Sequence, residues 1–185
     1  YPIHIQKEIE IIFAGGICDT ESAKIGTGMV RRSLAGSNIT FGILVGSAYL
    51  CTNEIVETKA TTKNYQDITL KCTKTVYLET AAGHQSRCAD TEFSKTFEFT
   101  KNKLIEQGAA PKEIAQELDK LILGKLRLAS KGKKRVGNQL VSVSIEEQTK
   151  EGMYMVGDAV TLIDYLQSIR ELHDSLNNGI KYMPE

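Results

Sequence analysis

The chain has 185 residues, of which 41% are hydrophobic and 25% are charged, and its 23 basic and 23 acidic residues leave no net charge. This balance is typical of an ordinary globular protein and argues against a nucleic-acid binder, which would carry a basic face or stripe. No apolar run approaches the roughly 20 residues of a membrane-spanning helix and no signal peptide opens the chain, so we expect a cytoplasmic protein without a membrane segment.

The four cysteines, at positions 18, 51, 72 and 88, are scattered and lack Cys-x-x-Cys spacing. A zinc centre or a dithiol redox site requires closely spaced pairs of thiols. We therefore predict reduced cysteines and no metal site.

The first predicted strand covers residues 9–13 and is apolar apart from Glu10, as expected of a parallel strand covered on both faces. It runs into Gly15 and Gly16, and a helix is predicted over residues 21–34 with Asp19 or Thr20 as its N-cap.

A second strand, over residues 39–45, ends in Gly46 and Ser47 and gives way to another helical pattern. At such a junction backbone N–H groups are free, the helix dipole is positive, and glycine lets an anion approach the backbone. The Ser47 hydroxyl adds a further donor. Two neighbouring junctions of this kind match the phosphate-binding loops after strands seven and eight of a (β/α)8 barrel. A tight turn without any ligand is the alternative interpretation.

Two stretches carry a resemblance to a known family. Residues 14–17, AGGI, precede a helix, and residues 42–54 read GILVGSAYLCTNE. Together they resemble the last two βα units of the nitronate monooxygenase family, in which AGGI and a helix precede G-(S/T)-x-x-x-x-(T/S)-x-E. The likeness is greatest to the enoyl-reductase-like members that accompany polyunsaturated fatty acid and polyketide synthases. It covers about residues 9–58, and a looser likeness includes residues 79–88 and 152–157.

This resemblance implies an α/β fold, the C-terminal part of an FMN-binding (β/α)8 TIM barrel, followed by a mainly helical region. It implies a boundary near residue 58, with the barrel units in residues 1–58 and the helical region in residues 59–185. It also implies that the backbone at two junctions holds the FMN phosphate while small side chains line it. The residues concerned are Ala14, Gly15, Gly16, Gly46, Ser47 and Ala48.

The implied activity is that of an FMN-dependent oxidoreductase, an enoyl reductase or nitronate monooxygenase, with NAD(P)H as a candidate hydride donor and a small-molecule or carrier-bound acyl substrate. The family's catalytic histidine lies upstream of these strands, so no catalytic residue carries over. A complete barrel needs about 250 residues. We therefore expect the chain to be the C-terminal portion of a larger protein, and its apolar faces to require the front half of the barrel, a companion subunit or self-association.

Two other functions remain open. One is a non-catalytic subunit that docks on a synthase partner, and the other is a phosphate-sugar isomerase or synthase, because many barrels share the same two-loop phosphate site.

Beyond residue 58 the patterns predict mostly helices. An exposed helix is expected over residues 55–72, with fraying around residues 61–62. Amphipathic helices are expected to residue 107 after a cap at Asp90 or Thr91, from Pro111 to about residue 123, and over residues 159–176. Short strands are expected over residues 73–80 and 140–145, with a glycine-bounded bend at residues 152–157 and a loose tail from residue 177.

His84 falls in a predicted loop near Arg87, and it is the best side-chain candidate for reaching an acidic substrate or a flavin edge. The alternative is that these residues fix the loop by hydrogen bonds. Residues 125–135 carry six cations and no acidic residue, and predict a solvated loop. Attraction of a phosphate-bearing partner, such as a pantetheine-linked acyl group, a carrier protein or NADPH, is the alternative.

Overall fold

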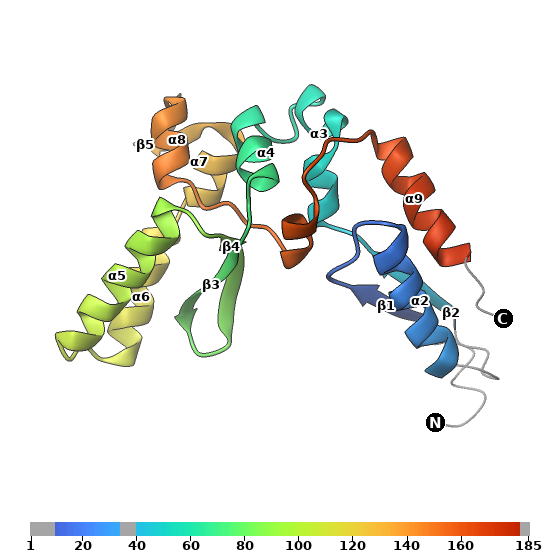
Figure 1. The fold of residues 1–185 in the computed structure, drawn as a ribbon. Coiled ribbons are helices and arrows are strands. Elements are labelled where there is room, and N and C mark those ends of the chain that lie inside the picture. The colour runs from blue at the N-terminus through green and yellow to red at the C-terminus, as the bar shows by residue number, and fades with distance from the viewer. Residues whose placement is uncertain (1–9, 34–39, 182–185) are drawn as a thin grey trace.

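A computed structural model describes residues 10–33 and 40–181 (Figure 1). Its first elements are β1 (Glu10–Ala14), α2 (Thr20–Ser33) and β2 (Thr40–Leu44). The two strands pair in parallel, from Glu10 opposite Thr40 to Ala14 opposite Leu44, with α2 as the crossover. This confirms the predicted strand, helix and strand, and their predicted ends at residues 9, 34 and 39 lie outside the described residues.

The exposure of β1 and β2 differs from the prediction. Side chains alternate between exposed and half-buried along both strands, and Ile12 and Leu44 are 63% and 55% exposed. The expectation of a strand covered on both faces is therefore wrong within this chain. One face of the two-stranded sheet carries bulky apolar side chains and has no covering layer among the described residues.

After β2 the chain forms η1 (Ser47–Cys51), α3 (Asn53–Glu57) and α4 (Lys63–Leu70). The helix predicted over residues 55–72 is present as two helices, and the break lies at the fraying that was predicted around residues 61–62. The Thr62 side chain caps the second helix by accepting a hydrogen bond from the Tyr65 backbone N–H. The second helix also has a buried face, formed by Tyr65, Gln66 and Thr69.

An antiparallel hairpin follows, made of β3 (Thr75–Ala81) and β4 (His84–Ala89). Gly83 makes its turn with φ of +79°, a conformation that favours glycine. The predicted strand is confirmed, and Gly83 lies in a turn as expected. The rest of the predicted loop, residues 84–88, is wrong, because these residues pair with β3.

The helical hairpin α5 (Glu92–Glu106) and α6 (Pro111–Ile122) confirms the predicted pair. Thr91 and Ser94 form a reciprocal capping box at the start of α5, and Pro111 opens α6. Phe93 and Phe97 on α5 are buried against β3 and α6. Figure 1 shows that α5 and α6 lie side by side and extend away from the other helices.

The segment after α6 contains α7 (Lys125–Lys131), the antiparallel strands β5 (Lys133–Val136) and β6 (Gln139–Ser142), and α8 (Ile145–Glu151). The solvated loop predicted over residues 125–135 is therefore wrong. Leu128 and Ala129 are buried, which fixes α7 against α8 and α4. The strand predicted over residues 140–145 is present only as far as Ser142.

The last elements are η2 (Asp158–Leu162) and α9 (Ile169–Lys181). The continuous helix predicted over residues 159–176 is wrong, because Gln167 pairs with a distant segment: its N–H donates to the Cys51 carbonyl, and its carbonyl accepts from the Asn53 N–H. The predicted loose tail is also wrong up to Lys181, where α9 ends; residues 182–185 lie outside the described residues.

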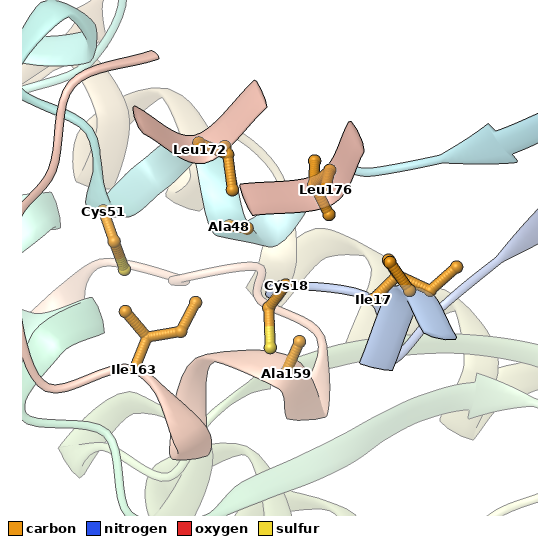
Figure 2. Packing of buried hydrophobic residues seen from close by; sticks show 9 residues of the cluster. Ile17, Cys18, Ala48, Cys51, Ala159, Ile163, Leu172 and Leu176 are labelled. Atoms are coloured by element: carbon orange, nitrogen blue, oxygen red, sulfur yellow. The ribbon is translucent and has the colours of Figure 1, made fainter. Parts of the chain in front are cut away.

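Helix α9 packs along α2, and Figure 2 shows the core that results. This core joins two parts of the chain that are far apart in sequence, and its buried members are Ile17, Cys18, Ala23, Ala48, Cys51, Ala159, Ile163, Leu172 and Leu176. The C-terminal segment thus covers the βαβ unit from one side. The division of the chain near residue 58 stays a prediction.

Candidate functional site

The carboxyl ends of β1 and β2 lie next to each other. Ala14 is paired with Leu44, so Gly15 and Gly16 leave the sheet beside Gly46 and Ser47. We call these four residues the strand-end site. Parallel pairing across a right-handed crossover places both junctions at the same edge of the sheet, and the sequence predicted that these junctions would be neighbours.

The glycines of the strand-end site leave open space around the backbone. Gly15 and Gly16 have φ of +91° and +74°, and no atom lies within 4 Å of the position that a Cβ would take at either residue. The Cβ position of Gly46 is likewise free of neighbouring atoms. All three residues and Ala14 are exposed. An anion can therefore approach this backbone without meeting the protein's own side chains.

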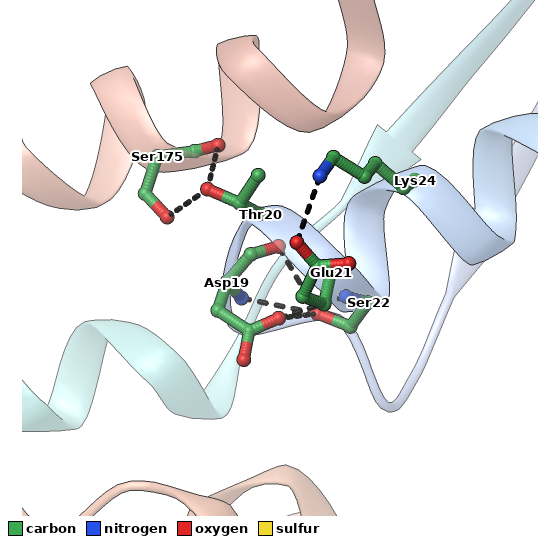
Figure 3. Close-up of polar contacts among 6 residues, drawn as sticks. All are labelled: Asp19, Thr20, Glu21, Ser22, Lys24 and Ser175. Atoms are coloured by element: carbon green, nitrogen blue, oxygen red, sulfur yellow. Dashed lines mark hydrogen bonds and ion pairs between the residues drawn. The ribbon is translucent and has the colours of Figure 1, made fainter. Parts of the chain in front are cut away.

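The start of α2, next to the glycines, is already capped (Figure 3). The Asp19 carboxylate accepts from the Ser22 N–H at 2.8 Å, and the Ser22 hydroxyl oxygen accepts from the N–H groups of Cys18 and Asp19 at 2.9 and 3.0 Å. This reciprocal cap confirms Asp19 as the N-cap. It also means that these amide groups are satisfied internally, so an anion must rely on the glycines and on the second junction.

Thr20, the other predicted cap, has a different contact. Its hydroxyl donates to the Ser175 carbonyl oxygen of α9 at 2.9 Å (Figure 3), and Arg31 of α2 donates to the Ile180 carbonyl oxygen at 3.1 Å. These contacts tie the two ends of α2 to α9.

At the second junction, the Ser47 hydroxyl oxygen accepts from the Gly157 N–H at 2.7 Å. Because the oxygen is the acceptor there, the hydroxyl proton remains available to another acceptor. Ala48 is 0% exposed and its methyl group lies in the core of Figure 2, so its side chain does not line the open space. Only its backbone can contribute to the site.

His84 lies elsewhere, as the first residue of β4 on the β3–β4 hairpin. It is exposed and lines a cavity of about 280 Å³ with Ser86 and Asp119. Within the part of the chain that the structure describes, no hydrogen bond or ion pair joins it to the strand-end site. Its catalytic role stays a prediction.

Arg87, which the sequence placed beside His84, has a structural role. Its guanidinium pairs with Asp158, donates to the Thr75 hydroxyl at 2.8 Å and stacks over the Tyr77 ring at 4.1 Å. The hydrogen bonds thus hold the hairpin to η2, as the alternative interpretation expected. Cys88 is buried, and burial raises the pKa of its thiol to about 12, which disfavours the thiolate form.

Sequence reasoning missed a tyrosine–histidine pair near the second junction. The Tyr49 hydroxyl and His173 Nε2 are 2.7 Å apart, and the two rings meet edge to face. Both residues line a cavity of about 210 Å³ between β2, η1 and α9. Because 124 residues separate them, no local pattern could have revealed the contact.

Within residues 10–33 and 40–181, no group of three or more histidine, cysteine or carboxylate side chains is arranged to hold a metal ion. None of the helices in these ranges is long and apolar enough to cross a membrane.

These elements define an α/β protein with a parallel βαβ unit, small antiparallel hairpins and a glycine-lined strand edge. Comparison with solved structures identifies FabK from Thermotoga maritima as a similar fold, with a TM-score of 0.62 and 18% sequence identity over 97% of this chain and 47% of that chain. A mutant form of FabK from the same organism matches with a TM-score of 0.58 and 16% identity, covering 97% of this chain and 45% of that chain.

At this identity the likeness shows a shared fold, and the chain spans just under half the length of the FabK chains. No protein-family model matches the chain, and no curated protein matches it.

Proposed function

We propose that this chain supplies the flavin-phosphate-binding part of an FMN-dependent oxidoreductase, similar to nitronate monooxygenases and enoyl reductases. The observation that carries the proposal is the register of β1 and β2, which sets Gly15 and Gly16 beside Gly46 and Ser47. FabK has a TIM-barrel fold, and the shared fold supports assigning β1 and β2 to the last two βα units of such a barrel.

The strand-end site fits a phosphate group. The Cβ positions of its three glycines are open, so an anion can approach their backbone, and the Ser47 hydroxyl keeps a proton to donate. One carboxylate oxygen of Asp19, Oδ1, accepts from the Ser22 N–H and hydroxyl and is thereby held at the start of α2. When bound, FMN would supply the hydride-transfer chemistry, while these residues hold and orient its phosphate.

The exposed apolar face of β1 and β2 fits the same proposal. Ile12 and Leu44 would be covered by the remaining strands of a barrel, contributed by the front half of the protein or by a companion subunit. NAD(P)H is the hydride donor that we propose, and the substrate class is a small-molecule or carrier-bound acyl compound.

The test is flavin binding by protein isolated together with any chain that co-purifies. We expect FMN to bind, with flavin absorbance near ~450 nm, and riboflavin, which lacks the phosphate, to bind at least about tenfold more weakly because the phosphate carries much of the affinity. Gly46→Asp should abolish FMN binding, since it places a carboxylate in the open space. Gly28→Asp, at another open glycine without positive φ, is the matched control and should bind normally.

Equal affinity for FMN and riboflavin, or full occupancy in the Gly46→Asp variant, would refute the phosphate assignment. Binding of ribose 5-phosphate that is lost in Gly46→Asp, without binding of FMN, would instead favour a phosphate-sugar enzyme. No binding of either ligand would favour the docking subunit.

A further inference from the structure

A cleft of about 690 Å³ lies between the loop at residues 58–62 and the segment formed by α7, β5 and β6. Its apolar lining comes from Val56 and Leu140, and its charged lining consists of Lys59, Lys63, Arg127, Lys131 and Lys133. Among the residues that the structure describes, no carboxylate lines it. We call it the basic cleft. Its volume is within the usual range for small-molecule sites.

The positive charge of the basic cleft is only partly compensated. Lys63 pairs with Asp67, and the Lys131 ammonium donates to the carbonyl oxygens of Lys59 and Ala60 at 3.0 and 2.9 Å. Lys59, Arg127 and Lys133 form no ion pair with any carboxylate of the described residues. Since the whole chain has no net charge, this is a local excess that an anion would neutralise.

The backbone of Lys59, one of the residues that line the basic cleft, has an unusual conformation. Lys59 has φ of 58°, and it is the only residue other than glycine with positive φ in residues 10–33 and 40–181. Glycine would adopt this conformation with less strain. A lysine here places a cationic side chain on the cleft at a cost to folding, which indicates that the side chain itself is needed.

Hydrogen bonds hold the loop at residues 58–62 against α7. The Thr62 hydroxyl donates to the Ala129 carbonyl oxygen at 3.2 Å and accepts from the buried Gln148 side-chain amide at 2.7 Å. The two sides of the cleft are therefore fixed relative to each other, so that ligand binding does not have to order them.

A neighbouring cavity of about 600 Å³ shares Arg127 and Lys133 with the basic cleft. Of its other cations, Lys125 pairs with Glu151 and Lys134 with Glu147, whereas Arg135 forms no ion pair with the described residues. The Glu151 carboxylate itself lines this cavity and disfavours an anion there. The basic cleft is thus the better anion site of the two. It shares no residue with the strand-end site, and Figure 1 shows α7 and β5 at the opposite side of the molecule from β1.

We propose that the basic cleft binds a small molecule in which a phosphate group is joined to an apolar moiety. Arg127, Lys133 and Lys59 contact the phosphate, and Val56 and Leu140 contact the apolar part. Arginine suits this role because its planar guanidinium can donate two hydrogen bonds to one phosphate.

The test measures binding of three probes to the full chain by calorimetry: phenyl phosphate, inorganic phosphate and phenol. Phenyl phosphate should bind more tightly than inorganic phosphate, and phenol should not bind. Arg127→Gln combined with Lys133→Gln should weaken phenyl phosphate binding at least tenfold. The control variant, Lys103→Gln with Lys112→Gln, removes the same charge from exposed positions on α5 and α6 and should bind normally.

A second variant separates binding from folding. Lys59→Gly should raise Tm, because it relieves the strained backbone, and yet weaken phenyl phosphate binding several-fold. AMP and 4′-phosphopantetheine then distinguish a nucleotide from a pantetheine source of the phosphate. Binding must persist in Gly46→Asp, which disables only the strand-end site.

Equal weakening in the cleft variant and the control variant would show a non-specific charge effect and overturn the proposal. So would normal binding in the cleft variant, or loss of binding in Gly46→Asp.

Discussion

Gly179 lies on the face of α9 that packs against α2, and it is buried. A Cβ at this position would meet the Thr20 carbonyl oxygen well inside 3.0 Å, and it would lie 2.6 Å from the Ala23 Cβ and 3.1 Å from the Lys24 backbone nitrogen. These are backbone atoms and a short side chain, which cannot move aside as a flexible side chain could. The Gly179→Ala variant must therefore push α9 away from α2.

The magnitude follows from two opposing effects. Alanine in place of glycine within a helix stabilises it by about 1 kcal/mol, whereas overpacking costs about 1–3 kcal/mol and contacts with backbone lie near the upper end. We expect a net loss of about 2 kcal/mol in the free energy of unfolding. For a chain of this size that lowers Tm by about 4–8 °C.

Gly28→Ala is the matched control. Gly28 lies inside α2, and no atom lies within 4 Å of its Cβ position, so the same substitution should raise stability by about 1 kcal/mol. Urea unfolding followed by circular dichroism measures both variants. If Gly179→Ala stabilises the protein as Gly28→Ala does, α9 does not pack on α2 as described, and the core of Figure 2 is wrong.

Two other predictions concern buried groups. Thr27 is 1% exposed, and its hydroxyl has no hydrogen-bond partner among the described residues. Thr27→Val should therefore raise the free energy of unfolding by about 1–2 kcal/mol. The control Thr96→Val, on the exposed face of α5, should change it by less than about 0.5 kcal/mol, and equal effects of the two substitutions would contradict the burial of Thr27. Burial raises the pKa of the Cys51 and Cys88 thiols from an ordinary value of 9.0 to about 11 and about 12. The folded state therefore holds these protons more tightly than the unfolded state does. The contribution of the two thiols to the free energy of unfolding is complete below pH 9.0 and is lost as the pH rises towards the folded-state pKa values. Urea unfolding at about pH 8 and about pH 10.5 measures this loss, and equal stability at the two pH values would contradict it.

The parts of the fold that the sequence predicted are those specified by local chemistry. Thr91 and Ser94 cap α5, and Pro111 opens α6, because capping and proline effects act within one turn of a helix. The adjacent strand ends also follow from sequence, since consecutive strands are usually neighbours in a sheet and a helix between them makes the pair parallel.

The parts that sequence reasoning missed depend on partners far along the chain. Leu162, Ile163, Leu166 and Ile169 follow helical spacing, yet the backbone of Gln167 pairs with Cys51 and Asn53 and breaks the helix. One local feature did mark the true start of α9: Ser168 and Glu171 form a capping box, with the Glu171 carboxylate accepting from the Ser168 N–H at 2.7 Å.

The candidate site also has features that nearby residues determine and features that distant residues determine. Gly15 and Gly16 were recognisable because few other residues adopt backbone conformations with positive φ, whereas Gly46 has φ of −119° and was marked only by its place after a strand. The Asp19–Ser22 cap was also within reach of local reasoning, since only three residues separate its members. The bond between Ser47 and Gly157, however, spans 110 residues and could not be inferred.

The pairing of α2 with α9 also has a consequence for synthesis of the chain on the ribosome. Thr20 contacts Ser175, 155 residues later, so at about 5–20 residues per second Thr20 is synthesised roughly 8–30 s before its partner. Once α2 has left the exit tunnel, its apolar face is exposed to solvent and to chaperones until α9 follows. Pauses in translation between the two helices should therefore increase the yield of aggregated nascent protein.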